Sequence, residues 1–358
     1  MPNDPIQEYL PPIKGRGAAS NPNNRFDEIH LTKDSEYDPP QDPAPKTQFF
    51  KDTTKTLISY SDSPDMGPIA SINSYRGCEH GCIYCYARPY HEYLGMSSGV
   101  DFETKIFVKE NAPELLRREL SHKKWAPRVL MMSGVTDCYQ PAERRFQLTR
   151  RCLEVLNEFH NPVGIITKNK LVTRDLDILC EMARYDCMAV TVSLTTLNST
   201  IAQKMEPRTS QPQDRLDAIR KLRKAGVPVG VNIAPIVPGL TDEEIPHLVK
   251  AAVEAGAQWA GFIVVRLPYA VKDLFSQWLD NHFPDRKSKV INRIKEVRGG
   301  KLYDAKWGAR FKGEGPYADA LQKLFKISVQ KYGLPQQFPA LSIEHFKDPH
   351  KKQLTFFD

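Results

Sequence analysis

Residues 75–86 read Tyr-Arg-Gly-Cys-Glu-His-Gly-Cys-Ile-Tyr-Cys-Tyr and place Cys78, Cys82 and Cys85 in a C-x3-C-x2-C spacing. Zinc sites with four ligands usually combine two C-x2-C pairs, and ordinary ferredoxins use four thiolates in a different run. Three thiolates on one loop can hold three irons of a 4Fe-4S cluster and leave the fourth iron open to a substrate or cofactor. The alternatives are a zinc knuckle with a distant fourth ligand and three unrelated thiols.

Short β-branched runs alternate with helical patterns from residue 69 onward. The predicted strands are 69–75, 129–133, 163–167, 189–194, 227–237 and 259–267. The segments between them carry apolar residues at helical spacing, as in Leu148, Cys152, Val155 and Phe159. Six βα units predict an α/β fold, a partial (β/α)6 TIM-like barrel of parallel strands. An extra strand at 105–109 and a helix at 113–120 fall between the first two units.

The chain divides by composition into three parts. Residues 1–68 hold 11 of the 28 prolines and predict an irregular, Pro-rich N-terminal arm, although runs at 49–50 and 58–60 could attach it to a core. Residues 69–285 form the predicted barrel. Residues 286–358 form a C-terminal helical extension with a basic stretch at 286–298 and its own helix at 318–332.

The overall composition is that of a soluble globular protein. It has 50 Lys and Arg against 43 Asp and Glu, a net charge of +7, with 26% charged and 41% apolar residues. An odd cysteine count of seven argues against a disulfide scaffold and favours a reducing, cytoplasmic setting. The N-terminus has no signal-peptide pattern, and no apolar run is long enough to span a membrane.

The cysteine motif and the six βα units, over about residues 69–285, resemble the radical S-adenosylmethionine (SAM) superfamily. The stretches 136–143, 167–168 and 192–196 resemble its spore photoproduct lyase-like branch. The resemblance implies that Cys78, Cys82 and Cys85 hold a 4Fe-4S cluster whose open iron chelates SAM. It also implies reductive cleavage of SAM to methionine and a 5′-deoxyadenosyl radical, which abstracts a hydrogen from the substrate. An electron donor of flavodoxin or ferredoxin type is the corresponding partner.

Polar residues follow the predicted strands at their carboxyl ends, where barrel active sites form. They include Ser133, Asp137, Lys168, Ser193 and Arg266. Buried parallel strands have no other evident need for polar side chains at one consistent end. These residues therefore predict the active site, although each could also be a strand-end cap or a solvated side chain.

The resemblance assigns several of these positions to SAM. Ser133-Gly134 occupies the place of the contact to the methionine amino group, where the family often has Gly-Gly. Lys168 and Ser193 match positions that bind the carboxylate and the ribose. The segment from Ile233 to Pro235, with the backbone around Tyr84, is the expected adenine surface.

Asp137 and Cys138 are the candidate catalytic residues, with Gln140 and Glu143 close by. A cysteine returns a hydrogen to the product radical in spore photoproduct lyase, but it precedes the aspartate there, whereas Cys138 follows Asp137. The hypothesis for Cys138 is a hydrogen donor, and the alternative is a small buried hydrophobe. Cys152, Cys180 and Cys187 are expected in the core.

The C-terminal part suggests two partners. A glycine- and aromatic-rich segment at 301–317 could cap the barrel, with Arg310 near an anionic substrate, or be an ordinary turn-rich lid. The peptide from Gln353 to Phe357 resembles the motif by which bacterial DNA enzymes bind the sliding clamp. With the basic stretch it favours a DNA substrate. RNA, a protein side chain or a small molecule are the alternatives, as is a non-catalytic iron–sulfur protein recruited to DNA machinery.

Overall fold

The computed structural model describes residues 11–26, 45–65 and 69–350. The peptide from Gln353 to Phe357 lies outside these described residues, so its predicted contact with a sliding clamp stays a prediction.

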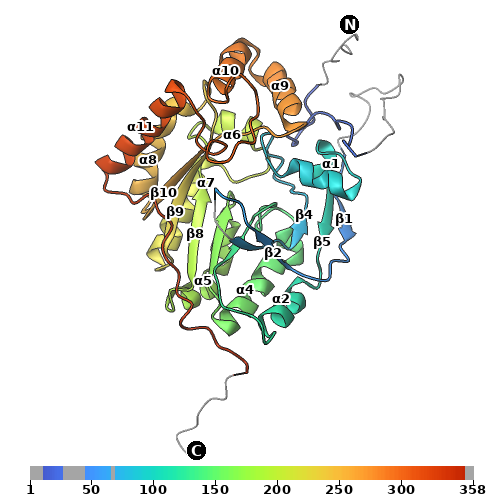
Figure 1. Ribbon diagram of the computed structural model, residues 1–358, viewed down its shortest axis with the longest axis vertical. Coiled ribbons are helices and arrows are strands. Elements are labelled where there is room, and N and C mark those ends of the chain that lie inside the picture. The colour runs from blue at the N-terminus through green and yellow to red at the C-terminus, as the bar shows by residue number, and fades with distance from the viewer. Residues whose placement is uncertain (1–10, 27–44, 66–68, 351–358) are drawn as a thin grey trace, which may run out of the picture.

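A seven-stranded sheet forms the centre of the molecule, in the order β10-β9-β8-β7-β6-β3-β2 (Figure 1). Six strands are parallel: β3 (Ile69–Ile72), β6 (Leu130–Met132), β7 (Val163–Thr167), β8 (Met188–Ser193), β9 (Val229–Ile236) and β10 (Ala260–Val264). The predicted α/β partial barrel of six parallel strands is confirmed. The strand predicted at 69–75 is wrong at its end, because it stops at Ile72 and Tyr75 belongs to another sheet.

The N-terminal arm is less irregular than predicted. Its strand β2 (Ile58–Ser61) pairs antiparallel with β3 at the edge of the barrel sheet. Strand β1 (Gln48–Lys51) joins β5 (Lys105–Val108) and β4 (Tyr75–Arg76) in a second, three-stranded sheet. The four-residue runs at 48–51 and 58–61 form strands because an established strand offers each of them a free edge to pair with.

Helices follow the strands and pack against the sheet and one another. They are α1 (Val100–Thr104), α2 (Ala112–Leu120), α3 (Glu143–Phe146), α4 (Leu148–Phe159), α5 (Leu176–Ala183), α6 (Ser199–Met205), α7 (Pro212–Lys224), α8 (Ile245–Glu254), α9 (Val271–His282), α10 (Pro284–Glu296) and α11 (Pro316–Lys331), with 3-10 turns η1 (Arg88–Leu94), η2 (Lys170–Asp175) and η3 (Asp242–Glu244). The predicted basic stretch lies on α10, and α9 and α10 lie together at one end of the molecule (Figure 1). No helix within the described residues combines the length and apolar composition that a membrane crossing requires.

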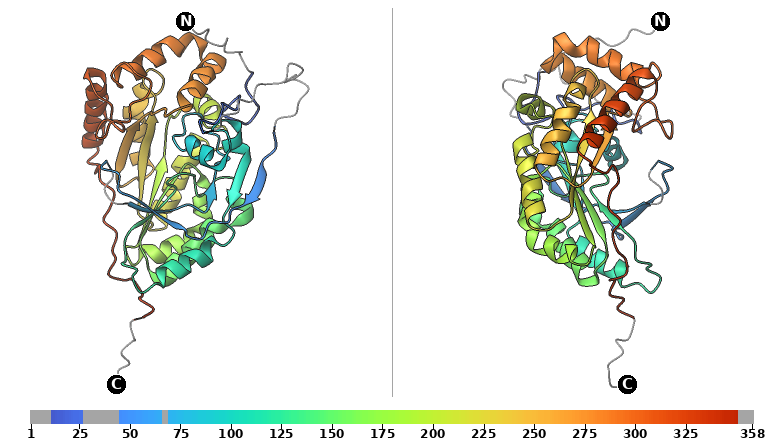
Figure 2. Two further views of the ribbon diagram at one scale, coloured as in Figure 1. Left: turned by 45° about the vertical axis from the view of Figure 1, so that its right-hand side comes forward. Right: turned by 90° about the vertical axis from the view of Figure 1, so that its left-hand side faces the viewer.

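The C-terminal segment, residues 335–347, closes the bottom of the barrel, at the N-terminal ends of the strands. Its backbone bonds in turn to Ala260, to Asp186 before β8 and to Phe159 at the end of α4. The Phe338 ring packs edge-on against Trp259, with 5.5 Å between the ring centroids. A Cβ on Gly164 would come within 2.9 Å of Phe338, and one on Gly230 within 2.2 Å of Trp259, so glycine leaves the space these rings fill. Figure 2 shows the segment running toward the end opposite α9 and α10.

A second C-terminal segment, residues 303–315, spans the open side of the barrel near the top. The Val264 amide of β10 donates to the Phe311 carbonyl at 2.8 Å. Arg310 then forms an ion pair with Asp65 and a hydrogen bond with Ser63, in the chain that follows β2. The two edge strands of the sheet are thereby linked through side chains, which accounts for Arg310 without a substrate anion.

Candidate active site

The cysteine loop lies between β4 and η1, beside the C-terminal ends of the parallel strands. Cys78 and Cys82 are buried and Cys85 is half-buried. Burial raises the pKa of Cys82 and Cys85, and other thiols of the loop raise it further. No three His, Cys, Asp or Glu side chains in the described residues are grouped as ligands of a single metal ion. Each thiolate of a cluster binds a different iron, so three free thiols on one loop fit a 4Fe-4S cluster.

A buried arginine fixes the shape of this loop. Arg88 is fully buried and donates to the Cys82 carbonyl at 3.0 Å and to the Gly99 carbonyl at 2.9 Å. It also pairs with the equally buried Glu103 at 2.5 Å. Two charges buried this deeply are stable only when they are paired and hydrogen-bonded, as here.

Glu103 extends the same network to the N-terminal arm. Its carboxylate accepts from the amides of Gly17 at 3.0 Å and Ala18 at 2.8 Å. The arm passes so close that a Cβ on Gly17 would lie 1.8 Å from the Gly81 carbonyl oxygen. The arm segment around residues 16–18 therefore forms a strap over the cysteine loop.

The loop after β6 clamps the other side of the cysteine loop. Gln140 accepts from the Glu79 amide at 2.9 Å and donates to the Gly77 carbonyl at 3.2 Å, on either side of Cys78. Thr136 donates to the same carbonyl at 2.8 Å. Gln140 is thus a positioning residue. Glu143, in contrast, accepts from the Tyr75 hydroxyl at 2.5 Å and from amides at the start of α4.

Asp137 connects the same loop to β7. Its carboxylate accepts from the Thr167 hydroxyl and the Lys168 amide, each at 2.8 Å, and lies 3.4 Å from the His80 ring. Burial alone would raise the pKa of Asp137, but His80 and the backbone donors hold it at about 2. The far side of the His80 ring contacts Asn169 at 3.1 Å. Asp137 therefore orients His80, which also contacts Cys78.

A buried network joins the cysteine loop to the ends of β8 and β9. Glu206 forms an ion pair with Arg215 and accepts from the Tyr84 hydroxyl, and both carboxylate partners are buried. Thr195 donates to Glu206 at 2.7 Å and to the Ala234 carbonyl at 3.1 Å. Arg215 also donates to the Ser193 carbonyl at 3.1 Å. Burial opposes ionisation of Glu206, but Arg215 and Lys168 lower its pKa.

The residues predicted to contact SAM lie around these networks. The Lys168 ammonium lies 5.9 Å from the centre of the Tyr84 ring and counteracts the burial effect on the pKa of Cys82. The Gly134 carbonyl accepts from Tyr86 at 2.7 Å, and Ser133 has a positive φ of 82°. Ser193 is buried at the end of β8.

The residues predicted to contact adenine differ in their burial. Ile233 is fully buried in the main core, whereas Pro235 is half-buried after a cis peptide bond. Pro235 is therefore the better candidate of the two for a contact with adenine. The roles of all these residues toward SAM remain predictions.

Cys138 is buried in the main core, with its amide bonded to Ser133 at 3.0 Å. Burial and then Asp137 raise the pKa of Cys138 well above its usual value, so the thiol keeps its hydrogen at neutral pH. Cys152 and Cys187 are fully buried, and Cys180 is half-buried against the core, as expected.

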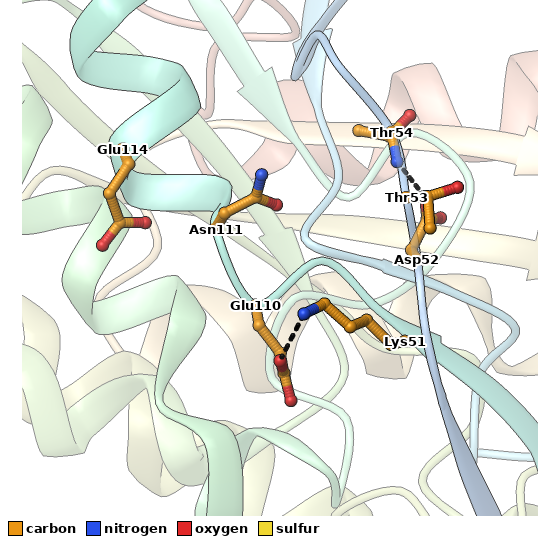
Figure 3. A pocket seen from close by; sticks show the side chains of 7 residues that line it. All are labelled: Lys51, Asp52, Thr53, Thr54, Glu110, Asn111 and Glu114. Carbon is orange, nitrogen blue, oxygen red and sulfur yellow. Dashed lines mark hydrogen bonds and ion pairs between the residues drawn. The ribbon is translucent and has the colours of Figure 1, made fainter.

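Four charged residues of the site have no signal in the sequence: Arg88, Glu103, Glu206 and Arg215. A charged residue inside a helical pattern is normally solvated, and only the tertiary partners show that these are buried. The surface hollow in Figure 3, lined by Lys51, Asp52, Thr53, Thr54, Glu110, Asn111 and Glu114, contains none of the predicted site residues. It lies beside the three-stranded sheet of β1, β5 and β4, where Lys51 pairs with Glu110 at 3.9 Å.

Several curated proteins are similar to this chain in sequence. An uncharacterized protein of Mycobacterium tuberculosis (strain ATCC 25618 / H37Rv) is 36% identical over 229 residues, which cover 63% of this chain and 66% of the relative. The chain thus matches just under two thirds of that relative's length. An uncharacterized protein of Methanocaldococcus jannaschii is 31% identical over 199 residues, covering 56% and 71%. A Pseudomonas phage M6 protein named radical SAM Nalpha-GlyT isomerase is 28% identical over 204 residues, covering 53% and 40%.

Solved structures share the fold. A mutant of spore photoproduct lyase superimposes with a TM-score of 0.60 at 17% identity, covering 81% of this chain and 82% of the other. The lyase complexed with dinucleoside spore photoproduct gives 0.59 at 16% identity, covering 81% and 82%. Residues 72–252 match the family model described as the radical SAM superfamily. This match spans half of the chain and contains the three-cysteine loop on the partial barrel, and it shows that the chain belongs to the radical SAM superfamily.

Proposed function

We propose that this protein generates a 5′-deoxyadenosyl radical and uses it to take a hydrogen atom from a base in DNA, in a reaction like that of spore photoproduct lyase. Superfamily membership implies a 4Fe-4S cluster, SAM and a reductant. The observation that carries the proposal is the set of three free thiols on one loop, which buried networks hold beside the C-terminal ends of the barrel strands. When bound, the reduced cluster and SAM supply the radical, with the electron from a donor of flavodoxin or ferredoxin type.

The chain's own residues have three tasks in this reaction. Cys78, Cys82 and Cys85 would bind the cluster, and Arg88 and Gln140 hold the loop that carries them. Lys168 and Ser193 would bind the SAM carboxylate and ribose, and Pro235 would contact the adenine. Buried side chains such as Cys82 and Tyr84 would limit the access of water to the radical, so that it meets its target.

Two observations favour a nucleic-acid substrate over the alternatives. The solved lyase with the same fold has a dinucleoside as its ligand. The chain also has a net charge of +7, which favours contact with a polyanion. RNA, a protein side chain and a small molecule would use the same radical chemistry. A non-catalytic iron–sulfur protein would need no SAM pocket.

Anaerobic reconstitution tests the proposal. The protein with iron and sulfide, reduced with dithionite and given SAM, is expected to form 5′-deoxyadenosine and methionine. Cys82→Ser should abolish both the cluster absorbance and this activity, and Cys180→Ser should keep both. Dinucleoside spore photoproduct is then the first substrate probe, with deuterium at the abstracted position appearing in 5′-deoxyadenosine. If the fully loaded protein does not cleave SAM, the alternative of a non-catalytic iron–sulfur protein would be favoured.

A further inference from the structure

Exposed aromatic side chains gather around the top of the barrel. Nine aromatic side chains are exposed among the described residues, and six of them lie in this region: Phe26, Tyr86, Tyr90, Tyr93, Tyr269 and Trp307. Tyr93 is 66% exposed and Trp307 is 53% exposed. We call these six residues the aromatic rim. Such a concentration of exposed rings on one side of a protein marks an interaction surface.

Arginines alternate with the rings of the rim. The Arg25 guanidinium lies 4.6 Å from the centre of the Phe26 ring and 4.0 Å from that of Tyr269. The Phe26 ring in turn lies 5.0 Å from Tyr93. On the other side, guanidinium groups lie 4.1 Å from the ring of Tyr86 and 4.1 Å from that of Trp307, from Arg266 and Arg310 respectively.

The rim lies beside the cysteine loop. Tyr86 directly follows Cys85, and its hydroxyl donates to the Gly134 carbonyl after β6. Tyr90 and Tyr93 stand on η1, the turn that follows the loop. Arg266 comes two residues after the end of β10. These contacts place the rim at the C-terminal ends of the strands, where the substrate would enter.

This region also carries positive charge that the protein does not neutralise. Neither Arg266 nor Arg298 has a carboxylate partner in an ion pair within the described part of the chain. Arg298 instead donates to the carbonyls of Val264, Val265 and Ala309. Burial, and after it the nearby Arg266, lower the pKa of Arg298 to about 10, although Asp304 acts in the opposite direction. An anion beside Arg266 would relieve this repulsion.

Exposed rings next to guanidinium groups suit a chain that alternates flat bases with phosphates. Arg25 is paired with Glu92 and Arg310 with Asp65, so Arg266 is the rim guanidinium that would meet a phosphate. Aromatic side chains stack on bases that are not already stacked, and arginine binds the phosphates between them. A duplex hides the faces of its bases. Protein interfaces also use Tyr, Trp and Arg, but a phosphodiester supplies an anion next to each base, which matches Arg266 beside the Tyr86 ring.

We propose that the aromatic rim binds single-stranded or locally opened nucleic acid that flanks the reacting base. The identity of this substrate class rests on the proposed function, whereas the binding itself does not need SAM cleavage. The two can therefore fail separately.

Binding of a fluorescein-labelled 12-nucleotide single strand of DNA, measured by fluorescence anisotropy on the reconstituted protein, tests the inference. The Tyr90→Leu/Tyr93→Leu variant should bind at least about tenfold more weakly, since each base–ring stack contributes about 1–3 kcal/mol. Arg266→Met should lower the slope of log affinity against log salt by about 0.7. Tyr60→Leu is the matched control, because Tyr60 is 65% exposed beside Arg128 at the N-terminal end of β6.

The Tyr90→Leu/Tyr93→Leu variant should still form 5′-deoxyadenosine at the wild-type rate without substrate, which shows that it is folded and loaded. A 12-nucleotide RNA strand distinguishes RNA from DNA as the source of the bases. Wild-type protein that cleaves SAM but binds neither strand overturns the inference and leaves the proposed function intact. Equal affinity for an abasic strand of the same length, or unchanged affinity of the Tyr90/Tyr93 variant, also overturns it.

Discussion

Arg88 is the charged residue on which the shape of the cysteine loop depends. Its guanidinium has no access to water and is balanced by Glu103 and by carbonyls of the loop and of residues 98–99. A buried charge that loses its partner is far more costly than an exposed one. The buried Arg88–Glu103 ion pair, although costly to desolvate, therefore holds the loop in a single conformation.

Arg88→Met keeps much of the side-chain volume but leaves Glu103 buried without its partner. We expect the free energy of unfolding of the cluster-free protein to fall by about 3–5 kcal/mol, measured by urea denaturation. The reconstituted variant should also retain less iron. Arg184→Met, at a 75% exposed side chain, is the control and should change neither. Unchanged stability of Arg88→Met would show that the pair is dispensable.

Cys138 offers a second prediction at this scale. A thiol hydrogen exchanges with solvent, so a thiol that donates its hydrogen to a product radical delivers deuterium in D2O. Cys138→Ala should leave 5′-deoxyadenosine formation unchanged but remove most of the solvent deuterium from the product of dinucleoside spore photoproduct, measured by mass spectrometry. Cys152→Ala, at another fully buried thiol, should label the product normally. Unchanged labelling in Cys138→Ala would exclude it as the donor.

At the scale of elements, the strap over the cysteine loop ties the N-terminal arm to the site. Two amides of the strap end on Glu103, and Arg16 donates to the Glu103 carbonyl at 3.0 Å. Glycine at position 17 allows the two backbones to touch. The same carboxylate thus holds the strap on one side and Arg88 on the other.

Gly17→Ala places a methyl group where the Gly81 carbonyl oxygen lies. Such overpacking costs about 1–3 kcal/mol, so the docked strap should open roughly tenfold more often. Trypsin cleavage after Arg16 should accelerate accordingly, followed by gel electrophoresis. Ser20→Ala serves as the control, because it adds no atoms and removes one hydrogen bond, to Gln277. Equal cleavage rates in both variants would mean that the strap does not rest on this contact.

The elements differ in how well the sequence predicts them. The strands from β6 to β10 are rich in apolar and β-branched residues, and their pattern alone predicts them. Strand β2 cannot be predicted from its apolar pattern, because three of its four side chains are exposed and it forms only by pairing with β3. The loop from Thr136 to Glu143 was predicted as a site on resemblance, but its hydrogen bonds show that Gln140 positions the cysteine loop and Glu143 stabilises α4.

The whole molecule is a partial barrel completed by its C-terminal extension. One segment spans the open side through the Arg310–Asp65 pair, and another fills the bottom with Phe338. Composition makes residues 301–317 a possible cap of the barrel, but the contacts of both closures could not be predicted, because they join residues far apart in sequence. The position of the cysteine loop could be predicted, since the parallel strand β3 ends at Ile72, a few residues before the loop, at the C-terminal edge of the sheet.

The sliding-clamp motif gives a prediction for the whole chain. Truncation after Lys352 should abolish retention of the protein on an immobilised bacterial sliding clamp, as should the Phe356→Ala/Phe357→Ala variant at full length. Both proteins should keep wild-type SAM cleavage, which excludes misfolding. Retention of the truncated protein on the clamp would contradict the prediction that the C-terminal peptide binds it.

The path of the C-terminal segment has a mechanical consequence. Having crossed the bottom of the barrel, the chain reaches His350, whose ring contacts the Ser121 carbonyl at 2.7 Å, on the side away from the cysteine loop. A partner bound just beyond this point would attach to the protein at the bottom of the barrel. The end that carries the cysteine loop would then stay free to move. A tether of this kind raises the effective concentration of the enzyme along a polymer without competing for the surface that does the chemistry.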